Sequence, residues 1–154
     1  MEQQTKIQVE NGKLDLHIHR IFQLPAELLF KAYVEAQLIE QWMGTKVLKW
    51  DCRKHGAYQM QTLDQKGNIA FQAHGVIHEL IPQQKIVRTF EMENTPFGVQ
   101  LEIYTFKSIS PSASELNMHV IYESVEQRDQ VLKLPFAYGI NMAHDRIQKL
   151  MLQG

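Results

Sequence analysis

The chain has 154 residues, of which 44% are hydrophobic and 21% are charged, and its 16 basic and 17 acidic residues give a formal net charge of −1. This length is typical of one globular domain, which buries about two thirds of its unfolded surface without a disulfide or a metal. The composition excludes disordered and fibrous classes. The charges are interspersed, so we expect neither a nucleic-acid partner nor a membrane partner.

The single cysteine, Cys52, has no partner for an internal disulfide, which fits a reducing compartment. The first ten residues lack the apolar core of a signal peptide, and no run of about 18 apolar residues occurs anywhere in the chain. A cytoplasmic location is therefore expected.

The first third of the chain predicts a strand followed by two helices. Residues 1–12 are polar and end in a turn dipeptide, so we expect a loose tail or a short strand before a single domain over residues 13–153. Apolar residues alternate with polar ones from Lys13 to Phe22, which indicates a half-buried strand. Helical spacing follows from Pro25 to Val34, and again from Ala36 to Gly44.

Six further strands are expected in the middle of the chain. Pro82 lies between two of them, where a residue that cannot donate to a strand ladder fits a hairpin turn. Runs at this spacing are typical of a strongly curved antiparallel sheet. The expected strands cover residues 45–52, 57–63, 69–80, 83–93, 99–106 and 115–123.

The last thirty residues predict two helices. Ser124 with Gln127 three positions later is a capping box, and Pro135 divides a short helix over about 125–133 from a long one. The long helix has an apolar stripe that must cover another surface, and the concave side of the sheet is the surface available. The stripe consists of Phe136, Ile140, Ala143, Ile147 and Leu150.

A family pattern is visible in four segments. Gly75–Phe90 combines a glycine, an apolar pair, a glutamate, a proline turn, a second apolar pair, an arginine and Thr-Phe. Together with Leu24–Tyr33, Leu38–Gly44 and Ser124–Asp129 it resembles the activator of heat-shock-protein ATPase-like branch of the START-like (SRPBCC) superfamily, over about residues 13–152. The resemblance implies an α+β helix-grip fold, in which a curved antiparallel sheet of six to seven strands surrounds a long C-terminal helix.

The gap between such a sheet and its helix is the natural place for a small molecule, and the family is known for a cavity there. Because a slip of one residue sends every member of a strand to the other face, the parity of individual strands stays open. Ten residues are expected to line the cavity: Trp42, Phe71, Ile77, Arg88, Phe90, Tyr104, Met118, Phe136, Tyr138 and Met142.

Arg88 shares a strand face with Ile86 and Phe90, which would bring its guanidinium into the interior. A buried guanidinium needs a carboxylate partner or an anionic ligand. An internal pair, or an edge position with the charge in water, is favoured over a ligand carboxylate or enolate. The candidate partners are Glu79, Glu91 and Glu102.

The histidines predict no metal site and no catalytic site. His17 and His19 share one strand face, but no third ligand is obvious, so a solvated face is favoured. His74 and His78 lie about 13 Å apart on one strand, which is too far to share an ion. His119 and His144 are isolated in the sequence, and we expect no metal and no other cofactor.

Three functions are compatible with this sequence. The first is binding of a small hydrophobic or amphipathic ligand in the cavity. The second is a cyclase-type or hydrolase-type enzyme acting in the same cavity, with Arg88, Tyr104 or a histidine as acid or electrophile. The third, implied by the family name, is a chaperone-associated stress regulator, although eukaryotic activators have an additional N-terminal domain that these residues do not contain. A second copy of the chain, as a homodimer, is a further candidate partner.

Overall fold

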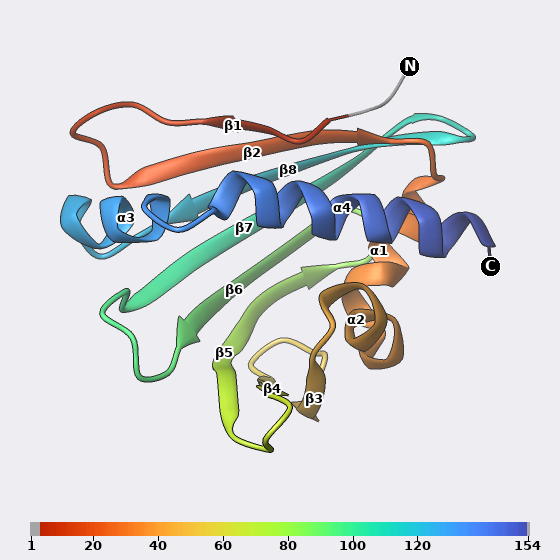
Figure 1. Cartoon of the computed structure of the whole chain (residues 1–154). Helices are drawn as coiled ribbons and strands as arrows, with labels where there is room; N and C mark the ends of the chain where they lie inside the picture. The colour runs from red at the N-terminus through yellow and green to blue at the C-terminus, as the bar shows by residue number, and fades with distance from the viewer. Residues whose placement is uncertain (1–3, 154) are drawn as a thin grey trace.

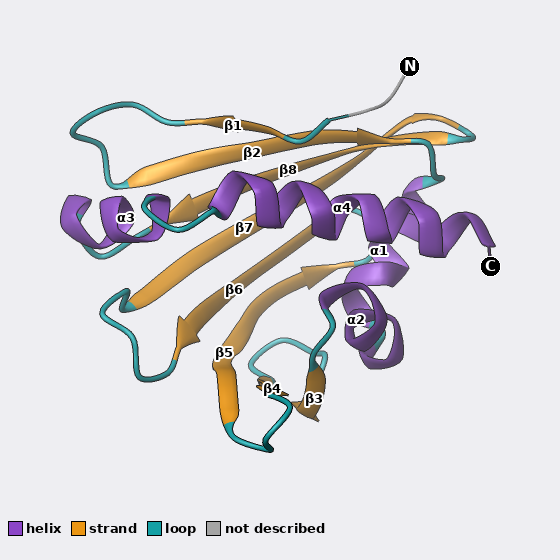
Figure 2. Cartoon of the chain, in the orientation of Figure 1, coloured by secondary structure: helices purple, strands orange, loops and turns teal. Residues whose placement is uncertain are grey.

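The computed structural model describes residues 4–153, which form an antiparallel sheet of eight strands and four helices (Figures 1 and 2). The strands follow one another in the order β1-β2-β8-β7-β6-β5-β4-β3, and every neighbouring pair is antiparallel. The strands are β1 (Lys6–Gln8), β2 (Asp15–Phe22), β3 (Lys46–Trp50), β4 (Ala57–Leu63), β5 (Ile69–Ile81), β6 (Lys85–Met92), β7 (Val99–Ser110) and β8 (Ala113–Ile121). The helices are α1 (Ala26–Val34), α2 (Ala36–Met43), α3 (Val125–Leu132) and α4 (Phe136–Gln153).

The expected helix-grip architecture is confirmed, with one strand more than the sequence predicted. The sheet is open and curved, and α4 crosses its concave side (Figure 1). The additional strand is β1, which pairs through Lys6–Gln8 with His17–His19 of β2. Of the two expectations for residues 1–12, a loose tail or a short strand, the structure shows a short strand at Lys6–Gln8. The boundaries of the domain stay a prediction.

Alternating apolar residues build the inner face of the sheet, as the sequence predicted. On β8, Leu116, Met118 and Val120 are buried. On β2, Leu16 and Ile18 are buried and alternate with His17 and His19, which lie on the outer face. Successive strand side chains point to opposite faces, so each strand contributes one row to the core and one row to the outer surface.

Strand β3 does not alternate regularly beyond Val47. The pairing of β3 with β4 shifts register between Val47 and Lys49, and this bulge changes which residues point inward. Trp50 packs on the core and donates from Nε1 to the Val34 carbonyl at 2.8 Å, whereas Leu48 is 45% exposed. The connection between the strands expected over residues 99–106 and 115–123 is shorter than predicted, because β7 extends to Ser110 and β8 begins at Ala113.

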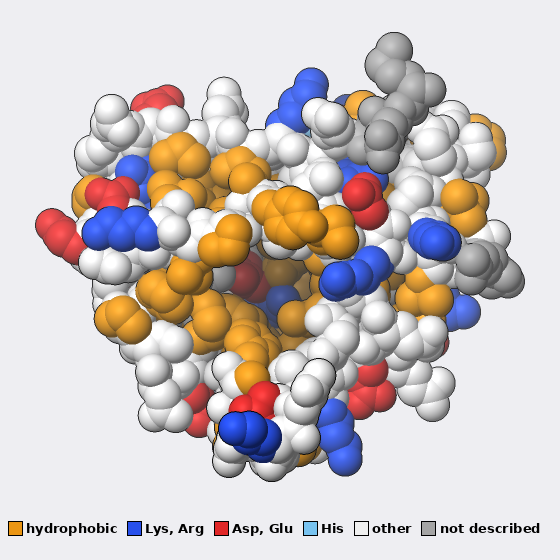
Figure 3. All heavy atoms as spheres, viewed as in Figure 1, with side chains coloured by type: hydrophobic (Ala, Val, Ile, Leu, Met, Phe, Trp, Pro, Cys, Tyr) orange, Lys and Arg blue, Asp and Glu red, His pale blue; other side chains and the backbone are white. Residues whose placement is uncertain are grey.

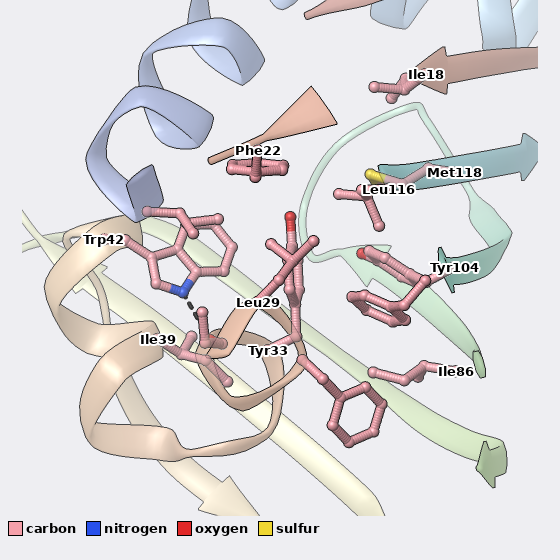
Figure 4. Close-up of a cluster of buried hydrophobic side chains, with 14 of the residues drawn as sticks. Ile18, Phe22, Leu29, Tyr33, Ile39, Trp42, Ile86, Tyr104, Leu116 and Met118 are labelled. Carbon is pink, nitrogen blue, oxygen red and sulfur yellow. Dashed lines mark hydrogen bonds between the residues drawn. The ribbon is translucent and has the colours of Figure 1, made fainter. Parts of the chain in front are cut away.

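Helices α1 and α2 close one end of the core with aromatic rings. The Tyr33 ring lies between Trp42 and Tyr104, at 5.2 Å and 5.3 Å between ring centroids (Figure 4). Trp42 Nε1 donates to the Ala32 carbonyl at 2.8 Å, which satisfies the buried indole. The end of α2 is set by Gly44, whose φ of 68° is the left-handed conformation that favours glycine.

Helix α3 begins at the expected cap, since Ser124 Oγ accepts a hydrogen bond from the Gln127 backbone N–H. Pro135 precedes α4, and all five residues of its predicted stripe are buried or pack on the core. Arg20, buried on the inner face of β2, binds α4 through Asp145 at 2.8 Å and Asn141 at 3.3 Å. The long helix is thus held over the sheet by apolar packing and by a buried cation.

Within residues 4–153, no helix is both long enough and apolar enough to cross a membrane.

Candidate ligand-binding cavity

A cavity of about 530 Å³ lies between the concave face of the sheet and α4. Figure 3 shows it as a hollow beside α4, with hydrophobic atoms around its opening and charged atoms at its bottom. Residues from all four helices and from β5, β6, β7 and β8 line it, together with the segment that joins α3 to α4. The volume is within the range of pockets that bury most of a small organic molecule.

The structure brings seven of the ten predicted residues together in the wall of this cavity. They come from α2, four strands and α4, which are distant in the sequence. Contact of these residues with a ligand stays a prediction. The seven are Trp42, Phe71, Arg88, Phe90, Tyr104, Met118 and Phe136.

The other three predicted residues do not line the cavity. Ile77 points inward as expected, but it is 1% exposed and belongs to the solid core. Tyr138 is 69% exposed, and Met142 is half-buried on α4 away from the wall. Tyr138 follows Phe136 by two positions, and Met142 follows Ile140 by two positions. Two positions correspond to about 200° around a helix of 3.6 residues per turn. They therefore point away from the sheet.

Gly139 lines the opening of the cavity on α4. A Cβ built on Gly139 would have nothing within 4 Å, so no close approach to the sheet requires a glycine here. The absence of a side chain leaves space beside the cavity.

Four polar side chains form a connected cluster in the wall. Arg88 donates from Nε to Glu102 Oε1 at 2.8 Å and from Nη2 to the Tyr104 hydroxyl at 2.7 Å. The Tyr104 hydroxyl donates to the same Glu102 oxygen at 2.8 Å. Gln100 donates to Glu102 Oε2 at 2.7 Å. Both oxygens of Glu102 are therefore occupied by donors from the protein.

Arg88 thus has an internal carboxylate partner, which was the favoured expectation, and of the three candidates the partner is Glu102. The two side chains are 9% and 7% exposed, so the pair is screened from bulk water. The rings of Tyr58 and Tyr104 flank the guanidinium at 5.1 Å and 5.0 Å. Among the described residues, Arg88 Nη1 has no hydrogen-bond partner.

Burial keeps two titratable groups of the wall, Tyr104 and His144, in one protonation state near neutral pH. Burial raises the pKa of Tyr104 well above its usual value, although Arg88 opposes this effect, so the phenol stays protonated. Burial and the nearby Arg20 charge lower the pKa of His144 to about 3, so its imidazole stays neutral. His144 Nδ1 lies 2.7 Å from Thr5 Oγ1, whereas Nε2 and the Tyr122 hydroxyl have no partner among the described residues.

The family model described as "Activator of Hsp90 ATPase homolog 1-like protein" matches residues 23–151. The chain belongs to this family. Its fold is the helix grip, a curved antiparallel sheet with a long C-terminal helix across its concave side. No curated protein matches the sequence.

Several solved structures share the fold of this chain, although their sequence identity to it is low. A protein of Rhodobacter sphaeroides is 19% identical, with a TM-score of 0.85 over 97% of this chain and 100% of its own. A protein of Mycobacterium smegmatis is 20% identical, with a TM-score of 0.83 over 96% of each chain. One of Arthrobacter aurescens is 11% identical, with a TM-score of 0.84 over 97% of this chain and 92% of its own. These similarities support the fold alone.

Sequence reasoning missed several members of the wall, and some had a detectable signal. Ala143 belongs to the predicted stripe of α4, and His144 follows Ile140 by four positions. Glu102 and Tyr104 are two positions apart on β7, so strand alternation places both side chains on the same face. Met92 follows Phe90 by two positions on β6, so strand alternation placed it on the face of Arg88 and Phe90 as well.

Proposed function

We propose that this chain binds one small amphipathic molecule in the cavity. The apolar body of the ligand lies against the aromatic and methionine side chains, and one neutral polar group, a carbonyl or hydroxyl, reaches Arg88. The observation that supports this most strongly is a largely apolar cavity of about 530 Å³ with one buried polar cluster in its wall. Ligand pockets commonly combine such a wall with a few polar groups that fix orientation.

The charge balance of the cluster favours a neutral group over a carboxylate. Glu102 already neutralises Arg88, so a ligand carboxylate beside Arg88 would add a buried charge that this pair does not compensate. Arg88 Nη1 is the donor left without a protein acceptor among the described residues. A carbonyl or hydroxyl oxygen accepts from it without breaking the bond between Arg88 and Glu102.

The enzyme alternative receives less support from the same groups. A general base works best with a pKa near the operating pH. His144 is neutral with a pKa of about 3, and Tyr104 is a phenol whose pKa is raised by burial. A chaperone-associated role and a homodimer stay alternative hypotheses, and no contact within residues 4–153 favours either.

Two phenylalanine variants of α4 test the proposal. Ala143 lines the cavity, whereas Ala137 is exposed on the same helix and does not. Ala143→Phe places a ring in the ligand volume, so we expect the affinity for the neutral probe N-phenyl-1-naphthylamine to fall by at least about tenfold, measured by fluorescence titration. Ala137→Phe adds the same ring outside the cavity and should leave the affinity within about twofold.

Circular dichroism establishes that each variant is folded before the titration. Folded Ala143→Phe with wild-type affinity for the probe would show that the cavity is not the binding site.

A further inference from the structure

Three side chains with metal-binding atoms meet on the outer face of the sheet. Asp15 and His17 belong to β2 and His119 to β8, and one ligand atom from each lies within 4.8 Å of the other two. His17 and His119 are directly opposed in the β2–β8 pairing, and directly opposed residues of antiparallel strands point to the same face. The inner neighbours of His17, Leu16 and Ile18, are buried, so this group lies on the side away from the cavity.

The distances within the group suit one ion. Asp15 Oδ2 lies 2.7 Å from His119 Nε2 and 3.8 Å from His17 Nε2. Two ligands bonded to one metal at about 2.1 Å are roughly 3.0 Å apart in an octahedral site and roughly 3.4 Å apart in a tetrahedral one. The two observed distances bracket these values, so small side-chain movements are sufficient.

The two imidazole rings are stacked, with centroids 4.2 Å apart and an angle of 8° between planes. Parallel rings direct their nitrogen lone pairs alongside one another, so an ion requires the rings to rotate toward a common point. Both side chains have room for this movement, because His17 is 56% exposed and His119 is 34% exposed.

We propose that Asp15, His17 and His119 form a binding site for a divalent transition-metal ion of the Zn²⁺ type. Two neutral imidazoles and one carboxylate are borderline ligands that suit Zn²⁺, Co²⁺, Ni²⁺ or Cu²⁺ better than Mg²⁺ or Ca²⁺. Three protein ligands leave one or more coordination positions to water. The ion joins β2 to β8, two strands whose ligand residues are about a hundred positions apart in the sequence.

The sequence predicted no metal here because His17 and His19 lacked a third ligand. The structure gives His17 different partners: Asp15 from its own strand and His119 from the neighbouring strand. His19 instead lies 3.6 Å from Glu115.

His74 offers a matched control on the same protein. It is a surface histidine with two carboxylates nearby, Glu91 at 3.4 Å and Glu93 at 3.1 Å, and it has no second imidazole beside it. Loss of His74 removes one exposed imidazole without touching the proposed site.

The test is calorimetric titration of the full chain, without a histidine tag, with ZnCl₂ at neutral pH. We expect one equivalent to bind to the wild type and to His74→Ala with the same affinity. His17→Ala and His119→Ala each lose a direct ligand, so the loss should exceed the roughly 10–100-fold that removal of an outer-shell partner costs. Absence of binding to the wild type, or binding that survives both substitutions, would overturn the proposal.

Histidine ring ¹⁵N spectra of the wild type give a readout that does not depend on any variant folding. Zn²⁺ should shift the ring nitrogens of His17 and His119 and leave those of His74 unchanged. Shifts confined to other histidines would place the ion elsewhere.

Discussion

At the scale of single residues, the pair of Arg88 and Glu102 is the central polar feature of the cavity wall, and we propose that it determines which ligand group the cavity accepts. Each side chain alone would be a buried charge, whereas together with Tyr104 and Gln100 they form a neutral cluster in which Arg88 Nη1 is left without an acceptor among the described residues. The sequence predicted an interior arginine with a carboxylate partner, because strand alternation fixes the face of a residue. It did not identify Glu102 among three candidates, because the choice depends on strand pairing: Arg88 lies directly opposite Glu102 across β6 and β7.

A double-mutant cycle tests this pair. Arg88→Met leaves the Glu102 carboxylate buried without a cation and should destabilise the protein by about 3–5 kcal/mol, measured by urea unfolding. Glu102→Met should also be destabilising, because it leaves the guanidinium unpaired. The cost of the double variant should be about 1–3 kcal/mol below the sum of the two single costs. Additive costs would mean that the two groups are not coupled, and Arg88 would then be available to an anionic ligand.

At the scale of elements, the fit of β5 against its neighbours depends on a glycine. A Cβ built on Gly75 would overlap the Thr89 carbonyl oxygen and lie 2.7 Å from the Tyr58 hydroxyl, which donates to that same oxygen. The sequence predicted the long strand and the proline hairpin correctly. It did not predict the bulge of β3, because a register shift leaves no periodic signal in so short a strand.

Two glycine-to-alanine variants should have opposite effects on stability. Gly75→Ala forces a methyl group into backbone, so we expect a loss of about 1–3 kcal/mol in the free energy of unfolding. Gly139→Ala adds a methyl group with nothing within 4 Å inside an exposed part of α4, so we expect a gain of about 0.5–1 kcal/mol. Urea unfolding measures both, and a tolerated Gly75→Ala would show that β5 and β6 separate more easily than their packing indicates.

At the scale of the whole molecule, the curved sheet and α4 enclose a cavity whose wall is drawn from most of the chain (Figures 1 and 3). Helical and strand periodicity predicted seven of its members, because the period of an element determines which side chains point inward. The prediction was wrong for Tyr138 and Met142, because both lie off the apolar stripe of α4 and do not line the cavity. Periodicity could not predict that His119 lies beside His17, because this contact depends on the pairing of β2 with β8 in the sheet.

The most direct test of ligand binding is native mass spectrometry of the wild-type chain and Ala143→Phe, each purified from the organism that makes the protein. Denaturing extraction then identifies any bound molecule. We predict one neutral amphipathic molecule per wild-type chain and its loss from Ala143→Phe, because the added ring occupies the same volume. A molecule retained equally by both chains, or a wild-type chain that is empty and also fails to take up N-phenyl-1-naphthylamine, would contradict binding in the cavity.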